Sequence, residues 1–195
     1  MNNRLTEIAE NQIDKVTNAK TIIDYPHHEG HEGNAYYVMY SVASLGAMTT
    51  PADMITLSFK TPDTAKWGHM VFSVFGTAGW RVRLIEAPTG GNASATGTLN
   101  ILNHNRNYSI SKPSTFTNGT TAGVFNYDAT LATGGITLWD QYLEGSAGPL
   151  SGGISVSKRS ELVLKQNTTY QLSLYGTDTN PATMIIDWYE HTNKA

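Results

Sequence analysis

Residues 54–60, Met54-Ile-Thr-Leu-Ser-Phe-Lys60, alternate between apolar and polar side chains. The apolar set begins at Ile55 and ends at Phe59, and polar residues occupy the positions between and after them. Successive side chains of a β-strand point to opposite faces of its sheet. This stretch therefore predicts a strand with one face in a core and the other in water.

The same two-residue period recurs along most of the chain after residue 35. Turn sequences such as Gly76-Thr-Ala-Gly79 and Pro88-Thr-Gly-Gly91 separate the alternating segments,. No helical segment of ten or more residues lies between them, which argues against a βαβ arrangement. We expect an all-β antiparallel sandwich, and the number of strands favours a jelly roll. The predicted strands are 36–45, 54–60, 70–76, 81–87, 98–103, 123–128, 136–142, 161–164, 170–175 and 184–189.

The composition limits the chemistry that the chain can perform. It has 195 residues, no cysteine, 13 basic and 16 acidic residues and a net charge of −3 at pH 7. These values exclude a disulfide scaffold, a thiolate metal site and a cysteine nucleophile, and they give no electrostatic footprint for nucleic acid. Only 15% of the residues are charged, whereas Gly, Thr, Asn and Ser make up 72 of the 195. That balance is typical of a turn-rich β-protein.

The N-terminal segment differs from the rest of the chain. Leu5, Ile8, Ile13 and Val16 fall near a helical period, which predicts an arm or short amphipathic helix that needs a partner surface,. We therefore divide the chain into an arm and lead-in at residues 1–27 and a β-sandwich domain at 28–195. No apolar signal region and no run of 18 apolar residues occurs, so we expect cytoplasmic synthesis and no membrane contact,.

Residues 24–33 hold the densest cluster of ionisable groups, including His27, His28 and His31. Imidazole is a common zinc and nickel ligand, so these histidines are candidate metal ligands. A proline and a glycine in the segment argue against a helix, and the spacing differs from the His-Glu-x-x-His motif. The alternatives are a polar loop, or a subunit contact that changes with histidine protonation. We expect no resident metal or other cofactor.

A carboxylate pair for glycoside hydrolysis has only weak support in this sequence. Most acidic residues are expected at strand ends or at the solvent-facing positions of strands, where a carboxylate is usually solvated. We therefore expect no enzymatic activity. The residues considered are Asp63, Glu86, Asp128, Asp140, Glu144, Asp187 and Glu190.

Four tryptophans divide into two groups. Trp67 and Trp80 follow turns, and an exposed indole there can stack on a sugar,. Trp139 and Trp188 lie inside apolar strands and are expected in the core,.

The segment from Asn100 to Tyr108 is strand-like and then rich in amides. Amide side chains both donate and accept hydrogen bonds, so Asn103, Asn105 and Asn107, with Arg106, can satisfy a sheet edge or pair with a neighbouring chain. A plain loop is the alternative.

Several motifs together resemble virion structural proteins of tailed bacteriophages, of the capsid decoration (cement) or head-fibre type. The resemblance covers roughly residues 28–191. It rests on the amide-rich Asn103–Asn107 segment and on His31-Glu-Gly33, Tyr36-Tyr37, Phe59-Lys-Thr-Pro-Asp-Thr64, Trp67-Gly-His69, Glu161-Leu-Val-Leu-Lys165-Gln-Asn-Thr-Thr-Tyr170 and Ile186-Asp-Trp-Tyr-Glu-His191.

This resemblance implies a non-enzymatic structural protein on the capsid surface of a virion. It implies the major capsid protein as partner and a homo-oligomer, with a trimer favoured over a dimer. A virion-associated carbohydrate- or receptor-binding module that uses Trp67 or Trp80 is the alternative. The expected capsid and subunit contacts are Leu5, Ile8, Ile13, Val16, His28, Glu29, His31, Asn103, Asn105, Arg106 and Asn107.

Overall fold

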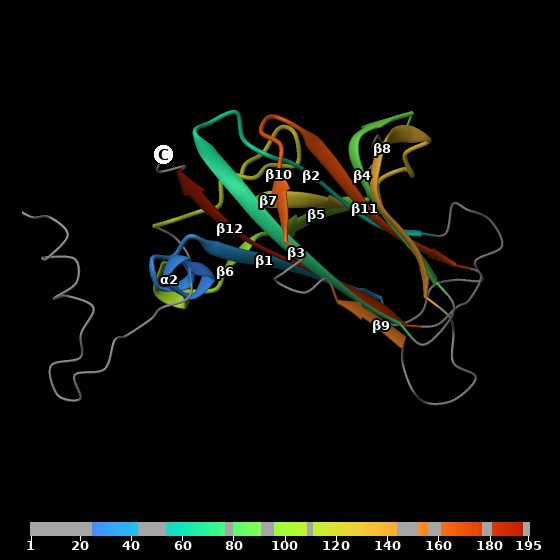
Figure 1. Cartoon of the computed structure of the whole chain (residues 1–195), viewed down its shortest axis with the longest axis horizontal. Coiled ribbons are helices and arrows are strands. Elements are labelled where there is room, and N and C mark those ends of the chain that lie inside the picture. Colours follow the sequence, from blue (N-terminus) through green and yellow to red (C-terminus); the bar gives the residue numbers. More distant parts are fainter. Residues whose placement is uncertain are drawn as a thin grey trace, which may run out of the picture.

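Two six-stranded antiparallel sheets pack face to face (Figure 1). Sheet 1 contains β10 (Leu162–Leu164), β3 (Lys66–Gly76), β12 (Ala182–Thr192), β1 (Ala35–Val42) and β6 (Leu102–Asn103) in that order, and β9 (Gly152–Ser155) also pairs with β3. Sheet 2 contains β5 (Gly97–Asn100), β7 (Val124–Tyr127), β2 (Met54–Lys60), β11 (Thr169–Gly176), β4 (Trp80–Thr89) and β8 (Gly134–Leu143) in that order. The computed structural model describes residues 25–42, 54–76, 80–90, 96–108, 111–143, 152–155, 161–176 and 181–192.

The all-β sandwich predicted from the alternation is confirmed, and jelly-roll topology stays a prediction. The segment predicted as one strand at 98–103 forms two, because β5 belongs to sheet 2 and β6 to sheet 1. Strand β9 was missed, since Gly152-Gly-Ile-Ser155 shows little apolar alternation. The predicted arm, with Leu5, Ile8, Ile13 and Val16, lies outside the described residues.

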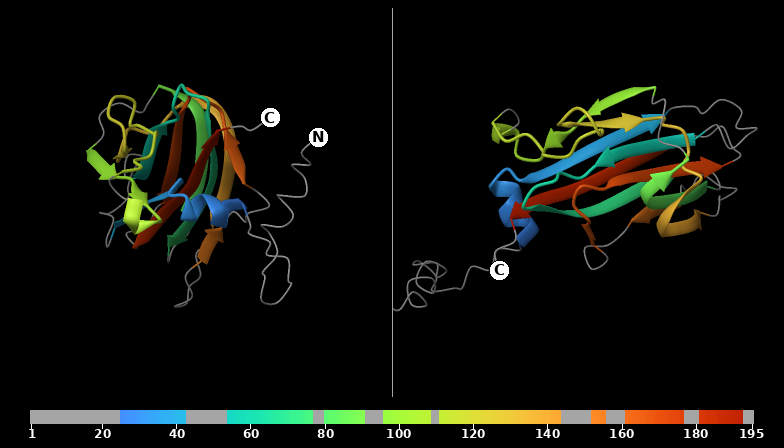
Figure 2. Two further views of the ribbon diagram at one scale, coloured as in Figure 1. Left: turned by 90° about the vertical axis from the view of Figure 1, so that its left-hand side faces the viewer. Right: turned by 90° about the horizontal axis from the view of Figure 1, so that it is seen from above.

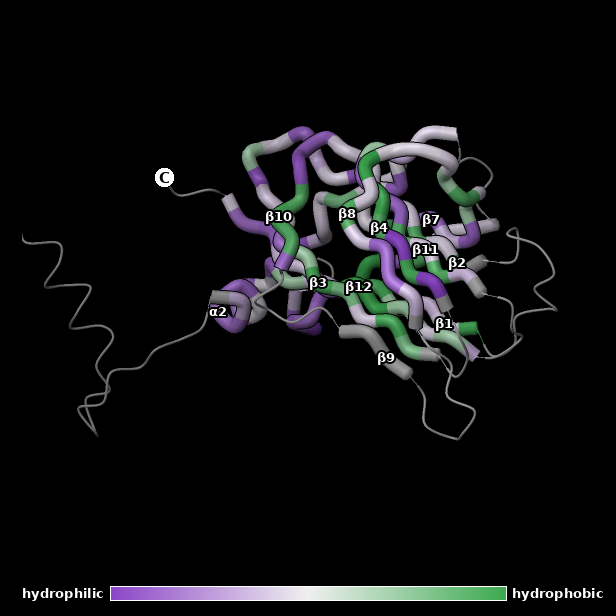
Figure 3. Tube along the Cα trace, turned by 45° about the vertical axis from the view of Figure 1, so that its right-hand side comes forward, coloured by the Kyte–Doolittle hydropathy of each residue, from purple (hydrophilic) through white to green (hydrophobic). Residues whose placement is uncertain are grey.

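Aromatic side chains fill one part of the core. Phe59 of β2 stacks on Phe125 of β7 at 4.4 Å between ring centroids and on Phe116 at 5.6 Å. Trp188 of β12 stacks on Phe116 at 5.0 Å and is only 3% exposed, so its predicted core position is confirmed. Trp139 is partly buried against the same core. The apolar strands appear green along the central part of the tube in Figure 3, while helix α2 is mainly purple.

The part of the outer face of sheet 2 formed by β2 and β11 is covered by the chain itself. Thr56 and Gln171 point away from the core but are almost completely buried. The segment 128–133 crosses above them: Thr56 Oγ1 donates to the Ala129 carbonyl (2.7 Å), and Gln171 Nε2 donates to the Thr130 carbonyl (2.9 Å). The polar side chains on this face are thus used to bind a covering segment, because a buried polar group is costly without a partner.

The outer face of sheet 1 is much more open. Met39 of β1, Phe75 of β3 and Val163 of β10 are 55%, 44% and 52% exposed. Their side chains point outward, because they alternate along each strand with the buried core positions. The covering material described at this face lies at one end, where helix α2 (Tyr25–His31) contacts β1 and β12 (Figure 1 and Figure 2).

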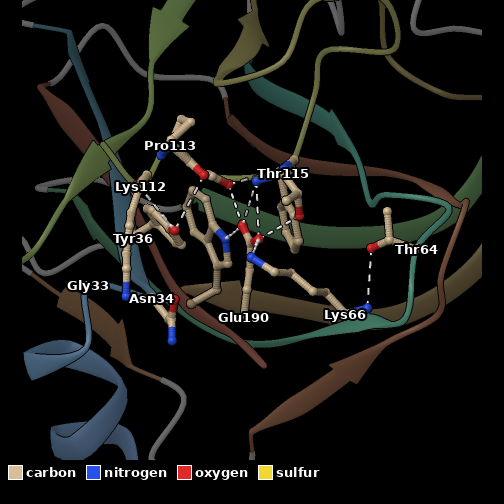
Figure 4. A network of polar contacts seen from close by, with 12 residues as sticks. Gly33, Asn34, Tyr36, Thr64, Lys66, Lys112, Pro113, Thr115 and Glu190 are labelled. Atoms are coloured by element: carbon tan, nitrogen blue, oxygen red, sulfur yellow. Dashed lines mark hydrogen bonds and ion pairs between the residues drawn. The ribbon is translucent and has the colours of Figure 1, made fainter. Parts of the chain in front are cut away.

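A buried carboxylate near the end of β12 ties the segment 112–116 to sheet 1 (Figure 4). Glu190 is 1% exposed and accepts from Thr115 N (3.1 Å to each carboxylate oxygen), Thr115 Oγ1 (2.5 Å) and Trp188 Nε1 (3.2 Å). Ser114 Oγ also donates to it, and Lys66 Nζ lies 3.9 Å away. Burying a carboxylate is tolerated only with this density of donors and charge, so the contact is specific as well as stabilising.

The Glu190 network continues to the start of β1. Tyr36, 1% exposed, lies with its hydroxyl 3.4 Å from the Lys112 carbonyl. Burial, and secondarily the negative charge of Glu190, raises the pKa of Tyr36 well above its usual range. Tyr36 therefore stays a neutral donor beside the carboxylate at any physiological pH.

Replacing Glu190 by Ala is expected to lower the free energy of unfolding by about 3 kcal/mol, because several buried donors lose their acceptor at once. Urea denaturation followed by tryptophan fluorescence measures the change. The matched control is Glu32→Ala, whose exposed carboxylate lies 4.0 Å from Lys112 and should contribute less than about 1 kcal/mol,. Equal losses in the two variants would contradict the anchoring role.

Candidate functional site

Helix α2 forms in the segment where the proline and glycine argued against a helix, so that prediction is wrong. Pro26 falls in the first turn, where backbone N–H groups have no intrahelical acceptor and proline is tolerated. Gly33, with φ of +74°, ends the helix in the left-handed conformation that glycine adopts readily,. Asn34 Nδ2 then donates to Glu29 Oε2 (2.8 Å), which fixes the exit from the helix.

The helix places His27 and His31 one turn apart on the same side. Their Nε2 atoms lie 2.9 Å apart and their ring centroids 4.5 Å apart. His28 is also exposed, and its Nδ1 lies 3.7 Å from Glu29 Oε1. Of the three candidate histidines, the structure therefore pairs two.

The amide-rich segment docks against the end of this helix. Asn103, 3% exposed, donates from Nδ2 to the Gly33 carbonyl (2.8 Å), and Asn105 Nδ2 donates to the His31 carbonyl (3.0 Å). Gly33 is required here for a second reason, since a Cβ atom on it would lie 2.6 Å from the Tyr108 ring. These contacts join two segments about 70 residues apart, both of which were predicted to contribute capsid or subunit contacts.

Not every predicted contact residue lies on the surface. Glu29 and Asn103 are buried, so they shape the junction and offer little area to a partner. Asn105 is partly exposed, and Arg106 and Asn107, in the short helix η1 (Arg106–Tyr108), are exposed. With His28 and His31, they form the exposed part of the prediction.

A cavity of about 670 Å³ lies between α2, the segment 104–107 and the outer face of sheet 1. Its floor is formed by β1, β3 and β12, and Glu161, just before β10, adds to its lining. The lining residues are Pro26, His27, Gly30, His31, Ala35, His69, Val71, His104, Asn105, Arg106, Asn107, Glu161, Asp187, Trp188 and Tyr189.

Four histidines contribute to the polar lining of this cavity. His104 Nε2 lies 3.1 Å from Asp187 Oδ1, and its ring packs on Tyr37 at 4.8 Å. His69 stacks on Tyr189 at 4.7 Å and makes a close ion-pair contact from Nδ1 to Glu161. Burial lowers the pKa of His69 below its usual value, although the Glu161 carboxylate acts in the opposite direction.

A second histidine pair joins the cavity to the end of β12. His69 Nε2 and His191 Nε2 are 2.7 Å apart. Sequence reasoning did not select His69, His191 or Glu161. Alternation does place His69 and His191 outward, but the pairing of β3 with β12 that brings them together cannot be read from either strand alone,. Among the described residues, no group of three or more His, Asp or Glu side chains has the geometry of a metal site.

The structure describes the side chain of one of the two tryptophans considered for sugar binding. Trp67 is 38% exposed on the outer face of sheet 1. Trp80 begins β4, and its side chain lies outside the described set.

The carboxylates considered for hydrolysis are engaged in structural contacts where they are described in detail. Glu144 lies outside the described residues, and Asp63 is exposed. The partners of the others are Tyr170 for Glu86 (2.9 Å), Tyr40 for Asp128 (2.8 Å), Arg81 for Asp140 (2.6 Å), His104 for Asp187 (3.1 Å) and the segment 114–115 for Glu190.

Comparison with known proteins finds no matching family model, no matching curated protein and no matching solved structure. No helix within the described residues is long and apolar enough to cross a membrane.

The lowered pKa of His69 predicts how stability changes with pH. Without metal, the folded state should protonate His69 at a lower pH than the unfolded chain, whose histidines titrate near 6.5,. The unfolded state then binds more protons between these two values, so this contribution is present above pH 6.5 and is lost as the pH falls. A histidine NMR titration in EDTA measures it, and a His69 pKa at or above 6.5 would contradict the expectation.

Proposed function

We propose that this chain is a structural protein of a phage virion, a decoration protein that binds the outer surface of the major capsid protein shell and stabilises the head. The observation that carries the proposal is the junction of α2 with the segment 103–108. Two segments distant in sequence combine there into one exposed surface at the end of the sandwich. The surface offers histidine, amide and guanidinium donors, which suit a wet, polar contact with a neighbouring protein.

The open face of sheet 1 supports the second part of the proposal, self-association. Asp187 is the single permanently charged residue among the outward positions of β1, β3 and β12. Interface centres are depleted in charged residues, and a nearly uncharged face can meet its own copy without like-charge repulsion. We favour a trimer over a dimer on the strength of the family resemblance.

Weak contacts are sufficient for such a protein if each assembly engages several capsid subunits. Linking binding sites raises the overall affinity without any new contact at a single site. A homo-oligomer that presents several copies of the α2–η1 surface to a symmetric shell has this property.

Purified virions of the phage that encodes the chain test the capsid assignment. Quantitative mass spectrometry should find tens to hundreds of copies per particle, and electron cryo-microscopy should locate them over the shell. Occupancy by Arg106→Ala should fall about tenfold, since Arg is often a dominant interface contact. Gln141→Ala, on the exposed strand β8, serves as the control. Absence from the shell would overturn the proposal.

Self-association is tested by size-exclusion chromatography with light scattering. The wild type should run as an oligomer, and Phe75→Lys or Met39→Lys should shift it toward the monomer, because each places a charge in the low-charge face. Tyr142→Lys is the matched control, since Tyr142 is a 69% exposed aromatic on the other sheet. A monomeric wild type, or equal shifts in all three variants, would contradict the assigned face.

The exposure of Trp67 favours one alternative, a virion module that binds carbohydrate or a receptor,. Glycan-array binding by the wild type that is lost in Trp67→Ala, together with a location at one vertex, would replace the decoration proposal with this one.

A further inference from the structure

We propose that His69 and His191 bind one divalent transition metal ion of the zinc and nickel class through their Nε2 atoms. The site spans two paired strands, β3 and β12, at the rim of the cavity. It is separate from the residues proposed above to contact the capsid, so the two proposals stand or fall independently.

The groups beside each Nδ1 atom set the protonation of both rings. His69 Nδ1 contacts the Glu161 carboxylate, which can only accept a hydrogen bond when ionised,. His191 Nδ1 lies 3.2 Å from the Thr192 carbonyl oxygen, which is also an acceptor. Each Nδ1 atom therefore carries the proton, and in the neutral rings each Nε2 atom carries a lone pair.

Those two lone pairs meet at a separation of 2.7 Å. Two acceptors at that distance repel each other. A metal ion bound to both lone pairs removes this repulsion. The tautomers are those of metal-binding histidines, whose other ring nitrogen usually donates to a carboxylate or backbone carbonyl.

The geometry needs a modest adjustment to hold a metal. Two zinc–nitrogen bonds of about 2.0–2.1 Å at the tetrahedral angle of about 109° place the nitrogen atoms about 3.3 Å apart. The two rings, whose Nε2 atoms are now 2.7 Å apart, would therefore separate by about 0.6 Å,. Imidazole nitrogen is a preferred ligand of Zn²⁺, Ni²⁺ and Cu²⁺. Two protein ligands leave the remaining coordination positions to water.

Glu161 acts as a positioning residue in this arrangement. Its contact with Nδ1 holds the His69 ring in place and increases the basicity of Nε2. The first histidine pair, His27 and His31, has a similar Nε2 separation of 2.9 Å. The contacts described for it show no acceptor that orients either Nδ1, so it is the natural competitor and the natural control.

Isothermal titration of ZnCl₂ into the full chain, after removal of metal with EDTA, tests the site. We expect one Zn²⁺ per chain. His191→Ala should weaken binding at least tenfold, and Glu161→Gln by about tenfold, because outer ligands typically contribute 10–100-fold. His27→Ala should leave binding unchanged. The absence of Zn²⁺ binding, or its loss in His27→Ala in place of His191→Ala, would overturn the proposal.

A measurement on the unmodified chain covers the case in which a variant fails to fold. Long-range ¹H–¹⁵N NMR of the histidine rings should show Nε2 shifts of His69 and His191 on addition of ZnCl₂, with His27 and His31 unchanged. Unchanged His69 and His191 signals would mean that neither ring binds Zn²⁺, and the metal proposal would fail.

Discussion

The contact between Glu190 and the segment 114–115 is the interaction on which the α2 end of the sandwich depends. One carboxylate, buried on the core side of β12, accepts hydrogen bonds from Thr115 N, Thr115 Oγ1 and Trp188 Nε1. It thereby fixes a long irregular connection against a regular strand. Because an unpaired buried carboxylate is very costly, few other placements of that connection are compatible with the fold.

The consequences reach the cavity through a short chain of contacts. The Lys112 carbonyl accepts from Asn103 Nδ2 (3.1 Å), and Asn103 in turn holds the Gly33 carbonyl at the end of α2. The helix, the amide-rich segment and the end of β12 are thus held in one arrangement. Irregular segments at this end of the molecule are therefore held in a fixed position by the sandwich beneath them.

The outer faces of the two sheets differ in how far other parts of the chain cover them. Sheet 2 binds its own segment 128–133 through Thr56 and Gln171. Sheet 1 leaves Met39, Phe75 and Val163 exposed, and Asp187 is the single permanently charged residue at the outward positions of β1, β3 and β12. This is the face proposed above for association with another copy of the chain, and its rim carries the histidine pair proposed to hold a metal ion.

The sequence by itself determined the strands and therefore the fold class. A two-residue alternation reports directly on which side chains face a core, and β2 at Met54–Lys60 was predicted to the residue,. It also identified the histidine-rich and amide-rich segments as a candidate surface. The sequence prediction was wrong at α2, where Pro26 and Gly30 were expected to prevent a helix. Pro26 is tolerated because it lies in the first turn, and the helix packs against β1 and β12,. Only the tertiary structure decided that Glu29 and Asn103 are buried, that Glu190 is an anchor and that His69 meets His191. Each of these three features depends on which strands pair and in what register. The sequence of one segment does not show which distant segment it pairs with.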